Sequence, residues 1–313
     1  MVKNLKDLKV VYMGTPEFAV PTLEMLIDET NVVGVVTQED KEVGRKKVLT
    51  PSPVKECALK HGIKVLTPHN IKEEYEEVLN LDPDIIITCA YGQIVPKVML
   101  DFPFYGCINI HGSILPEYRG ASPIQTAIMN GDSETGITIM YMDEQMDTGN
   151  IINMDKVIID DKDTYGTLSD KLSIVGKNLL LKTLPKIIED DNWNIKQDDE
   201  GATYTKKIKR EDERLDFNKT KKEVYNYIRA LNPTPLANIL LDDEEIKIVE
   251  AELGNDDKGD IGIITDVTKK YFSIQCLDGN INITKIKRAG KNIMNVSDFL
   301  NGYKGELLNK KVN

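Results

Sequence analysis

Short apolar runs alternate with amphipathic stretches in the first part of the chain. The runs that predict buried strands are 8–13, 32–37 and 84–89, and the stretches with helical spacing are 16–28 and 52–61. Ser52 is the expected N-cap of the second helix, and Pro53 is its expected first residue. Strands that alternate with helices predict right-handed βαβ units and a mostly parallel, Rossmann-like sheet, which is an α/β fold.

The alternation continues as far as residue 189. Further strands are expected at 107–111, 135–141 and 151–159. A long helix is expected over 164–189, because its leucines recur near the helical period. We expect this helix to end a first domain, 1–189.

The pattern changes in the last third of the chain. The stretch 190–214 is polar and has no period, which predicts a linker between domains. A helix is expected at 221–230, and Asn232-Pro233-Thr234-Pro235 then breaks the chain. Short strands are expected at 237–241, 246–252, 262–267, 271–277 and 280–287. Strands of this length with Gly and Asp turns predict a small, OB-like β-barrel over 215–313.

The composition fits a globular protein with more than one core. The chain has 313 residues, of which 41% are hydrophobic and 29% charged. No apolar run approaches the roughly 20 residues needed to cross a bilayer, and the N-terminus lacks a secretory apolar segment. We expect a cytoplasmic protein with no membrane partner, and a monomer.

The net charge of −11 argues against a nucleic-acid partner, but the charge is unevenly distributed. Residues 1–200 hold 20 Lys and Arg against 33 Asp and Glu, whereas residues 201–313 hold 20 against 18. Between Gly279 and Val296 there is no acidic residue, and the basic residues there are Lys285, Lys287, Arg288 and Lys291. Such a cluster suits contact with phosphates, although lysine-rich exposed strands are also common without such a ligand.

The four cysteines indicate neither a metal site nor disulfides. Cys57, Cys89, Cys107 and Cys276 are far apart and form no Cys-x-x-Cys pair. Cys89 and Cys107 fall in expected strands, so we expect them to be small core residues. No metal is expected.

Three polar residues at strand ends carry the candidate chemistry. Asn109 and His111 lie two apart in the expected strand 107–111, so their side chains face the same way. Asp147 lies in the loop after the strand 135–141. An amide can stabilise an oxyanion, an imidazole can share a proton and a carboxylate can accept one, which suits acyl transfer to an amine. The alternative is that these side chains only satisfy backbone groups.

Several strand ends are expected to meet at one cleft. The segments Gly14-Thr15-Pro16, Ala90-Tyr91-Gly92-Gln93 and His111-Gly112-Ser113 all follow expected strands. In open parallel sheets, ligands bind beyond these carboxyl ends. The turn Met13–Glu17 has a single glycine and no Walker lysine, which argues against a dinucleotide or nucleotide cofactor.

Motifs along nearly the whole chain resemble the methionyl-tRNA formyltransferase family. They are MGTPEFA at 13–19, TPSPVK at 50–55, AYG at 90–92, NIHGSILPEYRGASPIQ at 109–125, the stretch 143–149 and RALNP at 229–233. The resemblance implies a formyltransferase domain followed by a tRNA-binding barrel domain. It also implies transfer of a formyl group from 10-formyltetrahydrofolate to the amino group of methionyl initiator tRNA. The implied product is N-formylmethionyl-tRNA for translation initiation.

The resemblance also implies roles for individual residues. It gives the catalytic role to Asn109, His111 and Asp147. The residues implied to bind folate are Ser113, Ile114, Leu115 and Pro116, with Tyr91, Gly92 and Ile94 on the opposite wall. Ile114 stands where leucine is commoner in the family, a change that keeps an apolar contact.

Contacts with tRNA are implied as well. The segment 38–47 is longer than most connections between a strand and a helix, and in the family such an insertion enters the acceptor end of the initiator tRNA. Arg45 is therefore expected to read the acceptor end. The residues expected at phosphates of the acceptor stem are Lys46, Lys47, Lys207, Lys285, Lys287 and Arg288, with Lys206, Lys209 and Lys291 near them.

Two other functions remain open from the sequence. The first is a related folate-dependent formyltransferase or hydrolase that acts on a small amine, which the basic insertion and the basic barrel argue against. The second is an RNA-binding protein without catalysis, which the complete set of Asn109, His111 and Asp147 argues against.

Overall fold

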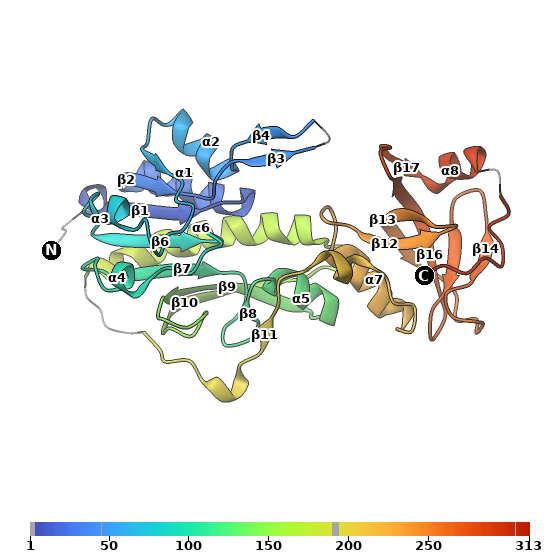
Figure 1. Ribbon diagram of the computed structural model, residues 1–313. Coiled ribbons are helices and arrows are strands. Elements are labelled where there is room, and N and C mark those ends of the chain that lie inside the picture. Colours follow the sequence, from blue (N-terminus) through green and yellow to red (C-terminus); the bar gives the residue numbers. More distant parts are fainter. Residues whose placement is uncertain (1–3, 45, 190–193, 304) are drawn as a thin grey trace. The chain divides into compact units, whose positions relative to one another are not determined.

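The computed structural model describes residues 4–44, 46–189, 194–303 and 305–313 (Figure 1). The chain forms two compact units, which are described separately. The first contains Met1–Gly120, Thr135–Val157 and Ser169–Tyr204, and the second contains Ala121–Glu134, Ile158–Leu168 and Thr205–Asn313. Each unit is therefore built from segments that are discontinuous in the sequence.

A seven-stranded sheet forms the centre of the first unit, in the order β10-β9-β7-β6-β1-β2-β5. Its strands are β1 (Lys9–Gly14), β2 (Asn31–Val36), β5 (Val65–Leu66), β6 (Ile85–Cys89), β7 (Cys107–His111), β9 (Glu134–Tyr141) and β10 (Ile151–Ile158). The five strands from β5 to β7 run parallel to their neighbours, and β9 runs antiparallel to β7. The predicted Rossmann-like, mostly parallel sheet is confirmed.

Helices accompany this sheet along the chain (Figure 1). They are α1 (Val20–Glu29), α2 (Pro53–Lys60), α3 (Glu76–Leu79), α4 (Lys97–Leu100) and the later part of α6 (Tyr165–Ile188), with 3-10 turns η1 (Leu5–Asp7), η2 (Glu17–Ala19) and η3 (Asp199–Gly201). Ser52 is the N-cap of α2, since its Oγ accepts from the Lys55 N–H at 3.0 Å. Pro53 occupies the first helical position, where no N–H is needed.

The sheet is covered on both faces, which explains its continuous apolar strands. On one face, Val11, Ile86 and Cys107 pack with Val78 of α3 and Met99 of α4 in a buried cluster. Alternate strand residues point to the other face, and there α6 lies against β7. A Cβ added at Gly176 would be only 3.1 Å from Ile110 Cγ2, so the glycine permits this close approach.

The long connection between β2 and α2 forms a hairpin in the first unit. It consists of β3 (Lys41–Val43) and β4 (Val48–Thr50), which pair in antiparallel register (Figure 1). The facing residues Val43 and Val48 are both more than half exposed. An apolar pair on an exposed two-stranded hairpin contributes little to stability, because both side chains stay in contact with water.

The second unit contains a curled antiparallel sheet in the order β12-β13-β16-β15-β14, with β17 paired to β16. Its strands are β12 (Ala237–Leu241), β13 (Glu244–Leu253), β14 (Ile264–Val267), β15 (Phe272–Gln275), β16 (Asn280–Arg288) and β17 (Ile293–Asn295). Its helices are α5 (Pro123–Asn130), α7 (Lys221–Ala230) and α8 (Val296–Gly302), with the 3-10 turn η4 (Arg210–Glu213). The helix expected at 221–230 has these bounds, and β17 is one strand more than the sequence predicts.

The end of the chain bridges the two edge strands of this sheet. Leu240 of β12 donates its N–H to the Asn313 carbonyl at 2.7 Å, and Ile264 of β14 donates to the Lys310 carbonyl at 2.8 Å. Val312 donates in turn to Gly262 at 2.8 Å. Because backbone groups of both edges find partners here, the curled sheet has barrel character without long open edges.

Two short strands, β8 (Arg119–Gly120) and β11 (Tyr204–Thr205), form a separate pair. In the first unit, the Arg119 N–H donates to the Thr203 carbonyl at 2.9 Å, which brings the residues before β11 beside the strand β8. In the described part of the chain, no helix has both the length and the apolar character to cross a membrane.

Candidate active site

Asn109 and His111 lie on β7, at the carboxyl end of the sheet. The neighbouring residues Cys107, Ile108 and Ile110 are buried, which fixes the strand in the core. Asn109 is half-buried and His111 is 5% exposed. The two side chains share a face, as the two-residue period requires, and both reach Asp147.

The amide of Asn109 is oriented by the neighbouring parallel strand. Thr88 on β6 is the register partner of Asn109, and its Oγ1 donates to Asn109 Oδ1 at 2.8 Å. The Nδ2 of Asn109 then faces Asp147, with Oδ1 of the carboxylate at 3.5 Å. Since one side of the amide is used by Thr88, its N–H groups are the donors that remain for the site.

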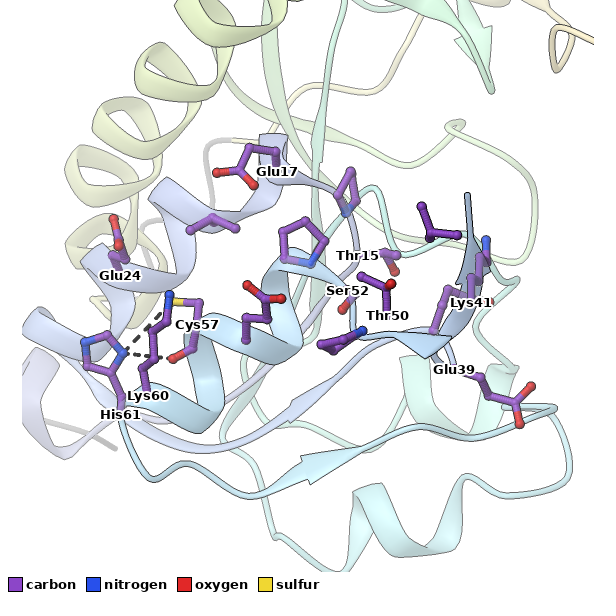
Figure 2. Close-up of a pocket in the computed structure, with 17 residues that line it drawn as sticks. Thr15, Glu17, Glu24, Glu39, Lys41, Thr50, Ser52, Cys57, Lys60 and His61 are labelled. Atoms are coloured by element: carbon purple, nitrogen blue, oxygen red, sulfur yellow. Dashed lines mark hydrogen bonds between the residues drawn. The ribbon is translucent and has the colours of Figure 1, made fainter. Parts of the chain in front are cut away.

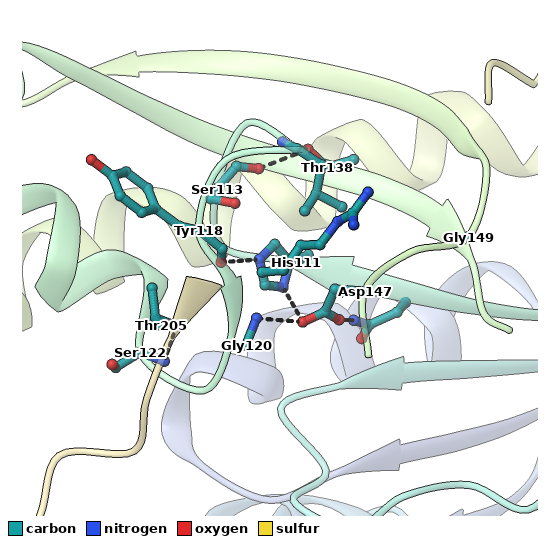
Figure 3. A network of polar contacts seen from close by, with 12 residues as sticks. His111, Ser113, Tyr118, Gly120, Ser122, Thr138, Asp147, Gly149 and Thr205 are labelled. Carbon is teal, nitrogen blue, oxygen red and sulfur yellow. Dashed lines mark hydrogen bonds and ion pairs between the residues drawn. The ribbon is translucent and has the colours of Figure 1, made fainter. Parts of the chain in front are cut away.

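His111 lies between a backbone carbonyl and the carboxylate (Figure 3). Its Nε2 is 3.0 Å from the Tyr118 carbonyl, and its Nδ1 is 3.6 Å from Asp147 Oδ2. A carbonyl only accepts, so Nε2 carries a hydrogen. Nδ1 is therefore the nitrogen that can exchange a proton at the site, and it faces the Asp147 carboxylate.

Asp147 lies in the loop between β9 and β10, with a left-handed φ of +58°. Its side chain is 14% exposed, and its Oδ2 accepts from the Gly120 N–H at 2.8 Å (Figure 3). Aspartate tolerates this backbone region better than most residues. The carboxylate thus faces Asn109 and His111 together, in a setting from which most water is excluded.

Gly149 fixes the course of this loop. It is buried, and a Cβ added there would overlap the carbonyl oxygen of Tyr141. The site therefore needs glycine two residues after Asp147, because any side chain would push the loop away from β9.

We expect Gly149→Ala to lower kcat by about 10² or more, since a shift of roughly 1 Å at a catalytic group has this effect. The midpoint of thermal unfolding should fall as well, because the alanine overlaps backbone. Gly302→Ala is the matched control, as a Cβ there meets nothing within 4 Å. Wild-type kinetics in Gly149→Ala would contradict the tight loop geometry.

The loop 113–116 is folded back on itself by hydrogen bonds. The Ser113 hydroxyl is buried and donates to the Glu117 carbonyl at 2.6 Å, while Thr138 Oγ1 donates to the Ser113 carbonyl at 2.7 Å. Leu115 is 2% exposed and packs with other core residues. Ile114 and Pro116 are the partly exposed members of the expected folate loop.

The residues expected on the opposite folate wall differ in their placement. The ring of Tyr91 is 4% exposed and lies in the apolar cluster under the sheet, where burial raises its pKa. Its carbonyl accepts from Thr15 Oγ1 at 2.9 Å and from Gln38 Nε2 at 3.2 Å. Gly92 is exposed and Ile94 is 58% exposed, so these two residues are accessible to a ligand.

A cavity of about 560 Å³ opens beside α1, α2 and the β3-β4 hairpin in the first unit (Figure 2). Thr15 and Gln38 line it from the ends of β1 and β2, and Lys41 and Val43 line it from the hairpin. Its remaining lining residues are Pro16, Glu17, Val20, Glu24, Glu39, Thr50, Pro51, Ser52, Pro53, Glu56, Cys57, Lys60 and His61. None of the residues expected to bind folate belongs to this lining.

Two of the residues expected to bind tRNA, Lys46 and Lys47, lie at the turn of the hairpin. Arg45 lies outside the described residues. Lys46 and Lys47 are exposed, and Lys47 is 3.2 Å from Glu42 across the hairpin. In the second unit, Lys206, Lys207 and Lys209 are exposed on the segment before η4.

The basic cluster of the barrel is partly neutralised by acidic residues of the neighbouring strand β13. Lys285 pairs with Glu250, and Arg288 makes two hydrogen bonds of 2.8 and 2.6 Å to Glu244. The sequence between Gly279 and Val296 contains no acid, so these partners appear only when the strands pair. Lys287 and Lys291 are exposed.

The cysteines carry no chemistry at the site. All four are free and buried, and burial raises the pKa of the Cys89 and Cys107 thiols to about 12. Thiols with such pKa values are poor nucleophiles at neutral pH. The described residues also contain no cluster of His, Cys, Asp or Glu that could bind a metal ion.

Several residues at the site are not marked by the sequence. Thr88 and Thr138 orient the motif through their hydroxyls, and Gly120 contributes only a backbone N–H. Gln197 belongs to the stretch that was expected to be a linker, and it contacts the Asp147 loop. Of these residues, Thr88 is the one that the sequence could have indicated, because it lies opposite Asn109 in the adjacent strand.

Known proteins match this chain over nearly its whole length. The formyl transferase family matches residues 8–184, and the formyl transferase C-terminal domain matches residues 207–304. A methionyl-tRNA formyltransferase of Staphylococcus epidermidis is 46% identical over 305 residues, which cover 96% of this chain and 98% of the relative.

Solved structures share the architecture. An N-formyltransferase from Helicobacter canadensis, in complex with folinic acid and dTDP-3-aminofucose, has a TM-score of 0.63 at 25% identity and covers 88% of this chain and 98% of its own. A methionyl-tRNA formyltransferase from Clostridium thermocellum has a TM-score of 0.56 at 17% identity, with 79% and 94% covered. The matches of both domains and the high identity over nearly the full length establish that the chain belongs to the methionyl-tRNA formyltransferase family.

Proposed function

We propose that this protein transfers the formyl group of 10-formyltetrahydrofolate to the amino group of methionyl initiator tRNA. The observation that carries the proposal is the meeting of Asn109, His111 and Asp147 at the carboxyl end of the sheet. The product is N-formylmethionyl-tRNA, the substrate for translation initiation, and we place the reaction in the cytoplasm.

The reaction is a direct transfer through a tetrahedral intermediate. The methionyl amine attacks the formyl carbon, a new C–N bond forms, and negative charge develops on the formyl oxygen. The bond from this carbon to N10 of the folate then breaks. Asn109 Nδ2 is the donor aimed at the developing charge, and a preorganised donor of this kind contributes a factor of about 10² to 10³ in rate.

Proton transfer is the role of Asp147 and His111. The attacking nitrogen must lose a proton, and the leaving N10 must gain one. Asp147 accepts the proton, either directly or through water. The contact with His111 Nδ1 holds this proton between the two side chains until it is transferred to the leaving N10. The hydrogen bond from Nε2 to the Tyr118 carbonyl keeps the imidazole turned toward the carboxylate.

Folate binding is assigned to accessible apolar groups around the motif. Ile114 and Pro116 supply one wall, and Gly92 and Ile94 supply the other. Ser113, Leu115 and Tyr91 support these walls from the buried side, since their side chains are in the core. No metal takes part in this scheme.

The macromolecular acceptor is bound by basic surfaces. The hairpin β3-β4 presents Lys46 and Lys47, and the second unit presents Lys207 and Lys287. Lys285 and Arg288 contribute by exchanging their acidic partners for phosphates. Such contacts are electrostatic, which makes the affinity for tRNA dependent on salt.

We expect Arg45→Ala to reduce the preference for initiator over elongator methionyl-tRNA, with a smaller effect on folate affinity. The reason is that a residue reading the acceptor end acts on specificity, whereas contacts to phosphates act on every tRNA alike. The measurement is kcat/KM for both tRNAs. An equal loss for both would show that Arg45 contacts phosphate only.

The identity of the acceptor is tested by offering the protein several amines. The protein is incubated with 10-formyltetrahydrofolate and methionyl initiator tRNA, methionyl elongator tRNA, or small amines such as amino sugar nucleotides. Formylated product on initiator tRNA, at a rate well above that of the others, is the expected result. Product on a small amine alone would replace the proposed acceptor, and no product on any would indicate a binding protein without catalysis.

A further inference from the structure

The stretch 194–204, which the sequence predicts to be a linker, runs along the catalytic loop in the first unit. Gln197 is its one buried residue, with 6% exposure. Its Nε2 donates to the Asp147 carbonyl at 2.9 Å and to the Gly149 carbonyl at 2.7 Å. Both hydrogens of the amide nitrogen are therefore bound to the backbone of the loop that carries Asp147.

The other end of the same amide is fixed by a buried arginine. Gln197 Oε1 accepts from Arg119 Nε at 3.1 Å and from Arg119 Nη2 at 2.9 Å. The Arg119 side chain is 1% exposed, and it also donates to Asp199 Oδ1 at 2.8 Å and to the Tyr204 hydroxyl at 3.0 Å. The guanidinium accepts no hydrogen bonds, so it determines that the oxygen of Gln197 faces it and the nitrogen faces the loop.

Arg119 also lies between the two residues that contact the catalytic side chains through backbone atoms. The carbonyl of Tyr118 accepts from His111, and the N–H of Gly120 donates to Asp147 (Figure 3). The segment 118–120 thus touches His111, Asp147 and Gln197 at once. A displacement of the Arg119 side chain would be transmitted to each of these contacts.

We propose that Gln197, oriented by Arg119, is a positioning residue that sets the backbone of the Asp147 loop for proton transfer. The proposal rests on the proposed catalytic role of Asp147. The loop needs such a support because Asp143, Glu144, Gln145 and Met146 are not buried and Asp147 itself has a positive φ. Without the amide, two carbonyls of the loop lose their donor, and the carboxylate loses its fixed distance to Asn109 and His111.

The test uses Gln197→Glu, which keeps the acceptor for Arg119 but removes the donors to the loop. We expect kcat for formyl transfer to fall by about 10-fold to 100-fold, with KM for folate and for tRNA within about twofold, because the loop shifts while the binding surfaces stay. Lys196→Gln is the matched control, since Lys196 is exposed on the same stretch. Its kinetic constants should equal those of the wild type.

A double variant separates positioning from a general loss of structure. In the Asp147→Asn background, Gln197→Glu is expected to add less than about a twofold loss, because the group that it positions is already absent. A further loss as large as in the wild-type background would overturn the proposal, as would a wild-type kcat for Gln197→Glu. High turnover in Asp147→Asn alone would instead contradict the role of Asp147, so the two failures are distinguishable.

Discussion

Asp147→Asn is expected to lower kcat for formyl transfer by a factor of about 10² to 10⁴, while folate still binds. The amide has the same volume, and its oxygen can still accept from the Gly120 N–H, so the loop should keep its course. What is lost is the group that accepts the proton of the attacking amine and shares it with His111.

The measurement is the steady-state rate with saturating methionyl-tRNA, together with the dissociation constant of folate. Glu144→Gln serves as a control, because Glu144 is an exposed carboxylate of the same loop that pairs with Lys97. Its kcat should remain within about twofold of the wild type. Near-normal turnover in Asp147→Asn would remove Asp147 from the proton pathway.

Asn109→Asp is expected to lower kcat by about 10² to 10³, the factor typical of a missing oxyanion donor. The new carboxylate would still accept from the Thr88 hydroxyl, so the side chain should keep its place. It would offer an acceptor where the formyl oxygen needs a donor, and it would bring a second negative charge close to Asp147, whose Oδ1 is 3.5 Å from Asn109 Nδ2.

Asn109→Ala separates these two effects. It removes the donor without adding charge, so its kcat should lie between those of Asn109→Asp and the wild type. The free energy of unfolding should be measured for both variants, since β7 is a central strand. A wild-type kcat in Asn109→Asp would mean that the oxyanion is stabilised by other groups.

Much of the first unit follows from the sequence because a parallel sheet covered on both faces requires continuous apolar strands. The runs at 8–13, 32–37 and 84–89 therefore appear as β1, β2 and β6 with shifts of one residue. The curled sheet of the second unit is similarly visible from alternation. Its closure is not, because residues 309–313 have no strand pattern, yet their backbone groups bond to both edge strands and Val312 packs in the core.

The candidate site is predictable only where strand geometry determines side-chain direction. Asn109 and His111 share a face because they are two apart in a strand, and Asp147 joins them from a loop that follows β9. The inward turn of the Ser113 hydroxyl could not be predicted, since it depends on the Glu117 carbonyl. The role of Gln197 could not be predicted either. It lies in a polar stretch without periodicity, and nothing in the sequence indicates that its side chain is buried.

The charge pattern of the sequence also predicts the proposed phosphate-binding surface only in part. Lys285 and Arg288 belong to a stretch without acids, yet cross-strand pairing places Glu250 and Glu244 beside them. A count of charged residues within one segment does not include the acidic partners that a neighbouring strand supplies. Lys46, Lys207 and Lys287 are exposed, and they are the residues that we propose contact phosphates.

The most direct measurement is a single-turnover experiment with 10-formyltetrahydrofolate labelled in the formyl group and bound to excess enzyme. When methionyl initiator tRNA is added, the label should appear on the methionyl amine at a rate that falls by about 10² or more in Asp147→Asn, with the same amount of folate bound. Label that stays on folate in the wild type, or moves at equal rates in both proteins, would contradict transfer by Asn109, His111 and Asp147.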